Sequence, residues 1–265
     1  MPRAGMPRGG MPRAGMPRGG MPRAGMPRGG VLRLGLLGGM SWESSALYYR
    51  LANELVAERL GGLHSAECLL YSVDFGPVEK MQAEGRWDDA GRLLAAAARS
   101  LELAGADVLV LCTNTMHKVA DVIEAAVTIP LLHIADAMAD AARRAGLRRI
   151  GLLGTAYTME QDFLRDRLAA DGLTVLVPGA ADRAAVHRVI FDELCRGVIR
   201  DESRQEFRQI MGRLAESGAE GIALACTEIE LLVGPGDSPV PLLPGTRLHV
   251  EAAVSRCLRG RTPAP

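Results

Sequence analysis

Two short polar motifs each follow an apolar run, and both contain side chains that can accept or donate a proton. The first reads Cys112-Thr113-Asn114-Thr115-Met116-His117, and the second reads Cys226-Thr227-Glu228. A helical pattern of apolar residues follows each motif, which places a nucleophile at the beginning of a predicted helix. Backbone N–H groups and the helix dipole stabilise anions there, so a thiol pKa falls below its usual value of about 8.5 and a carboxylate can bind. The motifs therefore predict a site for thiol-based proton transfer on a small carboxylate.

The remaining cysteines, Cys68, Cys195 and Cys257, lie in a predicted strand and in predicted helices without polar neighbours. We interpret them as small buried hydrophobic residues. The five cysteines form no CxxC pair and show no metal-ligand spacing with the five histidines, so we expect no metal site. Their odd number and wide spacing favour reduced thiols and a cytoplasmic location over a disulfide framework.

The elements that position these motifs alternate between short apolar runs and long amphipathic segments, as is typical of parallel sheets covered on both faces. We predict strands at 31–37, 67–73, 106–112, 149–153, 173–177, 220–225 and 239–243. We predict helices at 43–60, 88–104, 117–127, 134–146, 158–171, 181–199, 203–217 and 246–259. Ligands of such sheets bind beyond the carboxyl ends of the strands, which is where both motifs lie.

Repeated segments indicate an internal duplication. GLLG occurs at 35–38 and again at 151–154, and GADVLVLCT at 105–113 resembles GAEGIALAC at 218–226. The separations match, with 77 residues from the first GLLG to Cys112 and 75 residues from the second to Cys226. We therefore predict an α/β fold of two similar domains facing one cleft that is lined by two related strand ends. The first domain comprises 31–131 plus 239–265, and the second comprises 132–238.

Aligned without a gap, the duplicated segments pair Thr113 with Cys226, and Cys112 lies one position earlier. Neighbouring strand residues point to opposite faces, so Cys112 and Thr113 cannot both face the cleft. We favour Thr113 facing the ligand and Cys112 packing behind it, and the reverse arrangement is the alternative. A thiol titrates near neutral pH and a threonine hydroxyl does not, so Thr113 would need a proton relay through water, His117 or Glu228.

Two acid/base groups on opposite sides of a cleft suit racemisation at a carbon, because one removes a proton from one face while the other delivers a proton to the opposite face. Pyridoxal phosphate would be another route, and it needs a lysine for its Schiff base. Lys80 and Lys118 are the only lysines, and neither lies in a recognisable phosphate-binding context. We therefore expect no cofactor.

Longer motifs make the chain resemble the aspartate/glutamate racemase family over nearly all of 33–255. The motifs are GLLGGMSWESSALYYR, GGLHSA, YSVDF, LCTNTMHKVAD, LLHIADA, LLGTAYTMEQDF and ACTEIELL. The likeness is greatest to the broad-specificity and L-aspartate/glutamate-specific branch. The resemblance implies two flavodoxin-like domains, an active site between them, a two-base thiol mechanism without pyridoxal phosphate or metal, an acidic amino acid as substrate, and a homodimer. One departure is Thr113, which stands where the wider family has a cysteine before Asn-Thr.

Further substrate-binding candidates come from strand ends and from the family. Glycine lets the backbone approach a ligand just before Met40 and Ser41, and Gln82 matches a substrate-contacting glutamine of the family. The other candidates supply hydroxyl, amide, carboxylate or backbone groups, and they are Asn114, Thr115, Thr155, Thr158, Thr227 and Glu228. Glu228 has a second interpretation, because a carboxylate at a helix start stabilises the helix dipole. His117 is equally interpretable as a packing residue.

The first thirty residues repeat MPRAGMPRGG three times and show no apolar periodicity. We predict a disordered tail, because such a repeat cannot bury enough surface to fold. The repeat is also not expected to be a secretory signal, because it lacks the apolar segment of one. A mis-assigned start codon or an expanded DNA repeat would account for it, and a basic nucleic-acid-binding arm is the alternative.

Six of the 31 basic residues lie in this repeat, so the rest of the chain carries 25 basic against 31 acidic residues, which argues against nucleic-acid binding by the folded part. Its apolar runs are also much shorter than the roughly 20 residues of a membrane helix.

Two other functions fit the same pattern. One is a thiol-dependent decarboxylase or cis-trans isomerase of a dicarboxylate on the same fold. The other is a non-catalytic protein that binds an acidic amino acid in the cleft. The threonine at position 113 favours this alternative, because a hydroxyl is a weaker acid/base group than a thiol.

Overall fold

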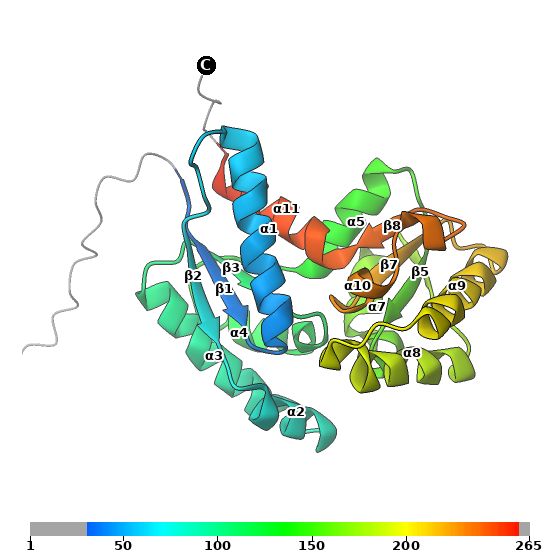
Figure 1. The fold of residues 1–265 in the computed structure, drawn as a ribbon. Helices are drawn as coiled ribbons and strands as arrows, with labels where there is room; N and C mark the ends of the chain where they lie inside the picture. Colours follow the sequence, from blue (N-terminus) through cyan, green and yellow to red (C-terminus); the bar gives the residue numbers. More distant parts are fainter. Residues whose placement is uncertain (1–30, 260–265) are drawn as a thin grey trace, which may run out of the picture.

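The computed structural model describes residues 31–259, so the repeat at 1–30 lies outside the described residues. The described chain forms two four-stranded parallel sheets with helices on both faces (Figure 1). Their strand orders are the same, β2-β1-β3-β4 in the first sheet and β6-β5-β7-β8 in the second. The strands are β1 (Leu34–Gly38), β2 (Cys68–Ser72), β3 (Val108–Leu111), β4 (Leu131–Leu132), β5 (Arg149–Gly154), β6 (Thr174–Leu176), β7 (Gly221–Ala225) and β8 (Leu242–Pro244).

Helices connect successive strands, as parallel pairing requires. The α-helices are α1 (Trp42–Leu60), α2 (Phe75–Ala83), α3 (Trp87–Leu103), α4 (Ala120–Glu124), α5 (Ile134–Arg144), α6 (Ala156–Glu160), α7 (Asp162–Ala170), α8 (Ala180–Asp192), α9 (Asp201–Glu216), α10 (Ile229–Leu232) and α11 (Gly245–Cys257). The 3₁₀ helices are η1 (Thr115–Val119), η2 (Leu194–Arg196) and η3 (Pro235–Asp237). None of the helices within 31–259 is both long and apolar enough to cross a membrane.

The register of the central strands confirms the duplication. Leu37 pairs with Leu111 in the first sheet, and Leu153 pairs with Leu224 in the second. Leu37 and Leu153 occupy the same place in the two GLLG repeats, so Leu111 and Leu224 are equivalent. The residues two positions later, Thr113 and Cys226, are therefore equivalent in the fold. The chain is an α/β protein of two pseudo-duplicated flavodoxin-like domains.

Four buried clusters hold helices against both faces of each sheet. In the first sheet, one face packs on α1 and α11 through residues such as Tyr48, and the other packs on α3 through Leu94. In the second sheet, one face packs on α8 and α9 through Phe207, and the other packs on α5 and α7 through Met138. Burial of each such side chain stabilises the fold by about 1.5–3 kcal/mol. The strand ends that carry the two polar motifs therefore belong to well-packed sheets.

Most predicted elements are present. The predicted helix 181–199 is shorter than expected, because α8 ends at Asp192 and is followed by the 3₁₀ helix η2, and the other differences occur in short or divided elements. We did not predict α2 or β4, because a helix of nine residues and a strand of two residues are too short for a periodic signal. The helix expected after Cys226-Thr227-Glu228 is α10, which has only four residues. The helix predicted at 158–171 is two helices, α6 and α7, because Gln161 between them has extended backbone. The helix predicted at 117–127 is η1 followed by α4.

Sheet membership corrects one part of the predicted domain division. Segment 239–265 was assigned to the first domain, but β8 pairs with β7 in the second sheet. Helix α11 then lies between the sheets and contacts both α1 and α5 (Figure 1). We name residues 31–132 the first half and residues 133–244 the second half, and α11 packs on both.

Candidate active site

A pocket with about 510 Å³ of empty space lies at the carboxyl ends of the central strands of both sheets. It contains all the predicted substrate-binding residues except Thr158, and two of the three predicted acid/base residues, Thr113 and Cys226. The lining residues are Met40, Ser41, Ser44, Phe75, Gln82, Thr113, Asn114, Thr115, Thr155, Ile190, Phe191, Cys195, Ala225, Cys226, Thr227 and Glu228. This is the location expected for a ligand of parallel α/β sheets.

Thr113 lines the pocket, whereas Cys112 lies in the hydrophobic core behind it. Cys112 is fully buried with Val108 and Val110, and its Sγ lies 3.7 Å from the Val110 carbonyl oxygen. Burial raises the pKa of the Cys112 thiol far above its ordinary value. Strand alternation therefore places the hydroxyl, and not the adjacent thiol, in the pocket.

Cys226 contacts the one charged residue among those that line the pocket. Its thiol donates to Oε2 of Glu228 at 3.0 Å, and Ser41 Oγ donates to Oε1 of the same carboxylate at 2.7 Å. Burial, followed by the charge of Glu228 and this hydrogen bond, raises the pKa of Cys226 well above its ordinary value. The expectation that a helix N-terminus lowers this pKa is wrong, because α10 has only four residues and a carboxylate lies against the thiol. Cys226 is therefore protonated at rest.

A directional chain of hydroxyl groups supports the second strand end. Thr246 Oγ1 donates to Thr227 Oγ1 at 3.3 Å, and Ser44 Oγ donates to the Cys112 carbonyl oxygen at 3.1 Å. Because the Ser44 proton is used there, Thr227 is the donor in the 2.8 Å contact between Thr227 and Ser44. The chain runs from α11 through the second half into the first.

Two more polar contacts complete the site. Thr115 and Thr155, from opposite halves, have their hydroxyl oxygens 3.2 Å apart. Thr155 also accepts from the backbone N–H of Thr158 as the N-cap of α6, and the Thr158 hydroxyl lies 3.2 Å from that of Thr155. Thr158 is fully buried outside the pocket lining and holds Thr155. Gln82, from α2, donates to Met116 Sδ at 2.9 Å.

His117 lies behind the first motif rather than in the pocket lining. Its Nδ1 donates to the Thr113 carbonyl oxygen at 2.8 Å, because a carbonyl can only accept, and its Nε2 accepts from the Ile134 backbone N–H at 3.2 Å. Both ring nitrogens are thus occupied by backbone, which rules out the proposed relay of a Thr113 proton through His117. Burial lowers the pKa of His117 well below its ordinary value, so the ring is neutral.

Sequence reasoning missed several residues that line the pocket. They are Ser44, Phe75, Ile190, Phe191, Cys195 and Ala225. Cys195 was interpreted as a buried hydrophobic residue, and it is half-buried at the pocket wall. Burial, followed by the nearby charges of Glu228 and Glu43, raises its pKa to about 12. Only Ser44 has a local signal, since it lies one helical turn after Ser41.

Comparison with known proteins identifies the family. Residues 37–253 match the model of the Asp/Glu/hydantoin racemase family. This match covers most of the chain, including both strand-end motifs, so the chain belongs to the Asp/Glu/hydantoin racemase family. Membership supports racemisation of a small amino acid as its general activity.

Solved structures show the same architecture. A Yersinia pestis protein proposed to be an Asp/Glu racemase is 52% identical, with a TM-score of 0.82 over 86% of this chain and 100% of that chain. An aspartate racemase homologue from Pyrococcus horikoshii OT3 is 32% identical, with a TM-score of 0.75 over 85% and 98% of the two chains. A glutamate racemase from Campylobacter jejuni is 18% identical and shares the fold, with a TM-score of 0.57 over 88% and 90%.

Proposed function

We propose that the protein racemises an acidic amino acid, aspartate or glutamate, by two-base transfer of the α-proton without a cofactor. The observation that carries this proposal is the convergence of Thr113 and Cys226. They occupy equivalent positions in the two duplicated sheets and line one pocket. Strand ends related in this way can present acid/base groups to opposite faces of one carbon. The similarity to a protein proposed to be an Asp/Glu racemase and to an aspartate racemase homologue supports aspartate or glutamate as the substrate.

The contacts of Glu228 suggest how the Cys226 thiol is activated. Glu228 takes the thiol proton along the existing hydrogen bond, and the resulting thiolate removes the α-proton of the substrate. The Thr113 hydroxyl then delivers its proton to the opposite face of the carbanion. Cys226 is left protonated, and the proton held by Glu228 returns to Thr113 through solvent, so every group regains its initial state.

Asn114 offers a specific contact for the substrate ammonium group. Its side-chain Oδ1 is buried and has no hydrogen-bond partner among the described residues, although Asn114 lines the pocket. A buried acceptor without a donor is costly. A bound ammonium group would satisfy this oxygen, while backbone N–H groups of Thr115 and Thr227 at the strand ends suit the α-carboxylate.

Exchange of the α-proton in deuterated water tests the proposal. Cys226→Ala should abolish this exchange while the protein remains folded, whereas Cys112→Ala should give near-normal turnover because its thiol lies in the core. Retained exchange in a folded Cys226→Ala protein would overturn the mechanism. The same measurement across acidic, neutral and basic amino acids identifies the substrate and separates racemisation from decarboxylation and from binding without catalysis.

The homodimer, the cytoplasmic location and the remainder of the domain division also stay proposals. Sedimentation of the purified protein tests the dimer, and separate expression of 133–244 tests whether the second half folds alone.

A further inference from the structure

We propose that His117 is a positioning residue that fixes Thr113 by linking its peptide group to the crossover between the two halves. This inference rests on the proposed function, because it assigns Thr113 one face of the substrate. His117 itself does not line the pocket, so it acts through Thr113 and not on the substrate.

The imidazole of His117 makes two backbone contacts with different consequences. Its Nδ1 donates to the Thr113 carbonyl oxygen at 2.8 Å, four residues back along the chain, and this contact closes the turn that begins η1. Its Nε2 accepts from the N–H of Ile134, the first residue of α5. The ring therefore links the carbonyl group of Thr113 to the first residue of α5, a helix of the second half.

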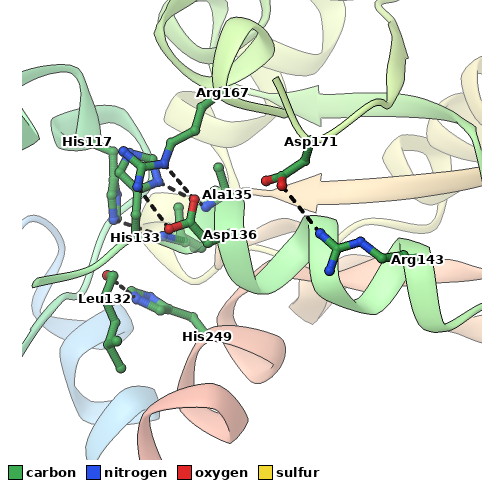
Figure 2. A network of polar contacts seen from close by, with 10 residues as sticks. His117, Leu132, His133, Ala135, Asp136, Arg143, Arg167, Asp171 and His249 are labelled. Carbon is green, nitrogen blue, oxygen red and sulfur yellow. Dashed lines mark hydrogen bonds and ion pairs between the residues drawn. The ribbon is translucent and has the colours of Figure 1, made fainter. Parts of the chain in front are cut away.

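The crossover at 132–135 is itself held in place from several directions, as Figure 2 shows. His249 on α11 donates from Nε2 to the Leu132 carbonyl oxygen at 2.8 Å. Its Nδ1 then accepts from the hydroxyl of Tyr48 on α1 at 3.0 Å. His133 accepts the Ala135 N–H at 3.1 Å as the N-cap of α5. His117 is thus anchored to a segment that both α11 and the second half support.

His133 provides a matched control for His117. The two rings are neighbours, with centroids 4.4 Å apart, and both are buried. The hydrogen bond of His133 stays within the first turn of α5, so His133 contacts the first motif through the ring of His117 and not through a hydrogen bond to Thr113. Asp136 and Arg167 form an ion pair beside His133, with Nε and Oδ1 2.6 Å apart. A substitution at His133 should therefore loosen this region as a substitution at His117 does. It should not misplace Thr113.

The experiment compares two quantities in deuterated water, the racemisation rate and the exchange of the α-proton at the Cys226 face. His117→Phe fills the space but removes both polar contacts, and it should slow racemisation by about ten- to hundredfold, the size of effect that misplacing a reacting group causes. Exchange at the Cys226 face should continue, so the ratio of exchange to racemisation rises. His133→Asn keeps an N-cap acceptor and should leave the ratio unchanged.

Two conservative variants make the test independent of whether His117→Phe folds. The amide of His117→Asn lies near the Nδ1 position and can still donate to Thr113, so this variant should restore the wild-type ratio. His117→Gln presents an acceptor near the Nε2 position but has no donor near the Thr113 carbonyl oxygen. The ratio of exchange to racemisation should therefore rise in this variant. Equal ratios in His117→Asn, His117→Gln and wild type would overturn the positioning role. A wild-type protein that racemises none of the amino acids would overturn the proposed function itself.

Discussion

Replacing Glu228 with glutamine separates the two roles that its carboxylate has beside Cys226. Oε2 accepts the thiol proton at 3.0 Å, and Oε1 accepts from Ser41 at 2.7 Å. Glu228→Gln keeps the shape of the side chain and removes its charge. At rest, burial and then the charge of Glu228 raise the pKa of Cys226, so the proton stays on sulfur. During turnover, the same carboxylate receives that proton.

The hydrogen bond sets the size of the expected effect. A hydrogen bond to a charged group contributes about 1.5–3 kcal/mol, and each 1.4 kcal/mol corresponds to about tenfold. Replacing this charge-assisted bond by a neutral one in Glu228→Gln should raise the thiolate fraction of Cys226 at neutral pH by about ten- to hundredfold. Alkylation of Cys226 by iodoacetamide should accelerate by a similar factor. Racemisation should fall by about a hundredfold or more, because the proton acceptor is lost.

The assay measures alkylation and racemisation on the same protein, with Cys226→Ala giving the background from the other thiols. Glu230→Gln is the matched control, because Glu230 lies two residues further along and its Oε1 accepts from the Thr246 N–H at 2.9 Å instead of from the thiol. It should change neither rate by more than a few-fold. Slower alkylation in Glu228→Gln, or unchanged racemisation, would refute the role of the carboxylate.

Two further predictions concern the first strand end and the buried histidines. Asn114→Ala should raise KM by about tenfold or more with a smaller effect on kcat, because it removes the acceptor for the substrate ammonium group, and a larger effect on kcat than on KM would oppose this role. Burial lowers the pKa of His249 from 6.5 to about 4, so the unfolded chain binds this proton first as pH falls. The free energy of unfolding should therefore decrease by about 3 kcal/mol between pH 6.5 and pH 4 on account of His249. Urea unfolding of wild type and His249→Asn measures this, and an equal decrease in both proteins would oppose it.

Sequence patterns predicted the parts of this fold that depend on local periodicity. Strand alternation and the duplicated segments were enough to place Thr113 in the pocket and Cys112 behind it, since both follow from backbone geometry. The same reasoning found most of the lining residues, because ligands of parallel sheets contact the residues that follow the strands.

Properties that depend on tertiary burial were not predictable in this way. The pKa of Cys226 is raised because its strand end is buried and Glu228 turns back onto the thiol, which motif spacing does not reveal. The Nε2 of His117 accepts from the backbone N–H of Ile134, seventeen residues away, which excludes a relay role and leaves no local signal in the sequence. Phe191 reaches the pocket from α8, and its distance along the chain from both motifs leaves no local signal.

The asymmetric pair also constrains what kinetics can show. Two enantiomers have the same free energy in water, so kcat/KM for racemisation must be the same in both directions. A preference for one enantiomer must therefore appear in kcat and KM separately, or in isotope exchange. Exchange is the more direct of these, because each face of the substrate is assigned to a different side chain.

The measurement that tests the central claim most directly is α-proton exchange from each enantiomer by Thr113→Ala in deuterated water. Cys226 can still remove a proton from one enantiomer and return a deuteron to the same face. We predict that one enantiomer exchanges with retention of configuration, that the other does not exchange, and that racemisation is lost. Undiminished racemisation by Thr113→Ala, or equal exchange of both enantiomers, would contradict the assignment of Thr113 and Cys226 to opposite faces.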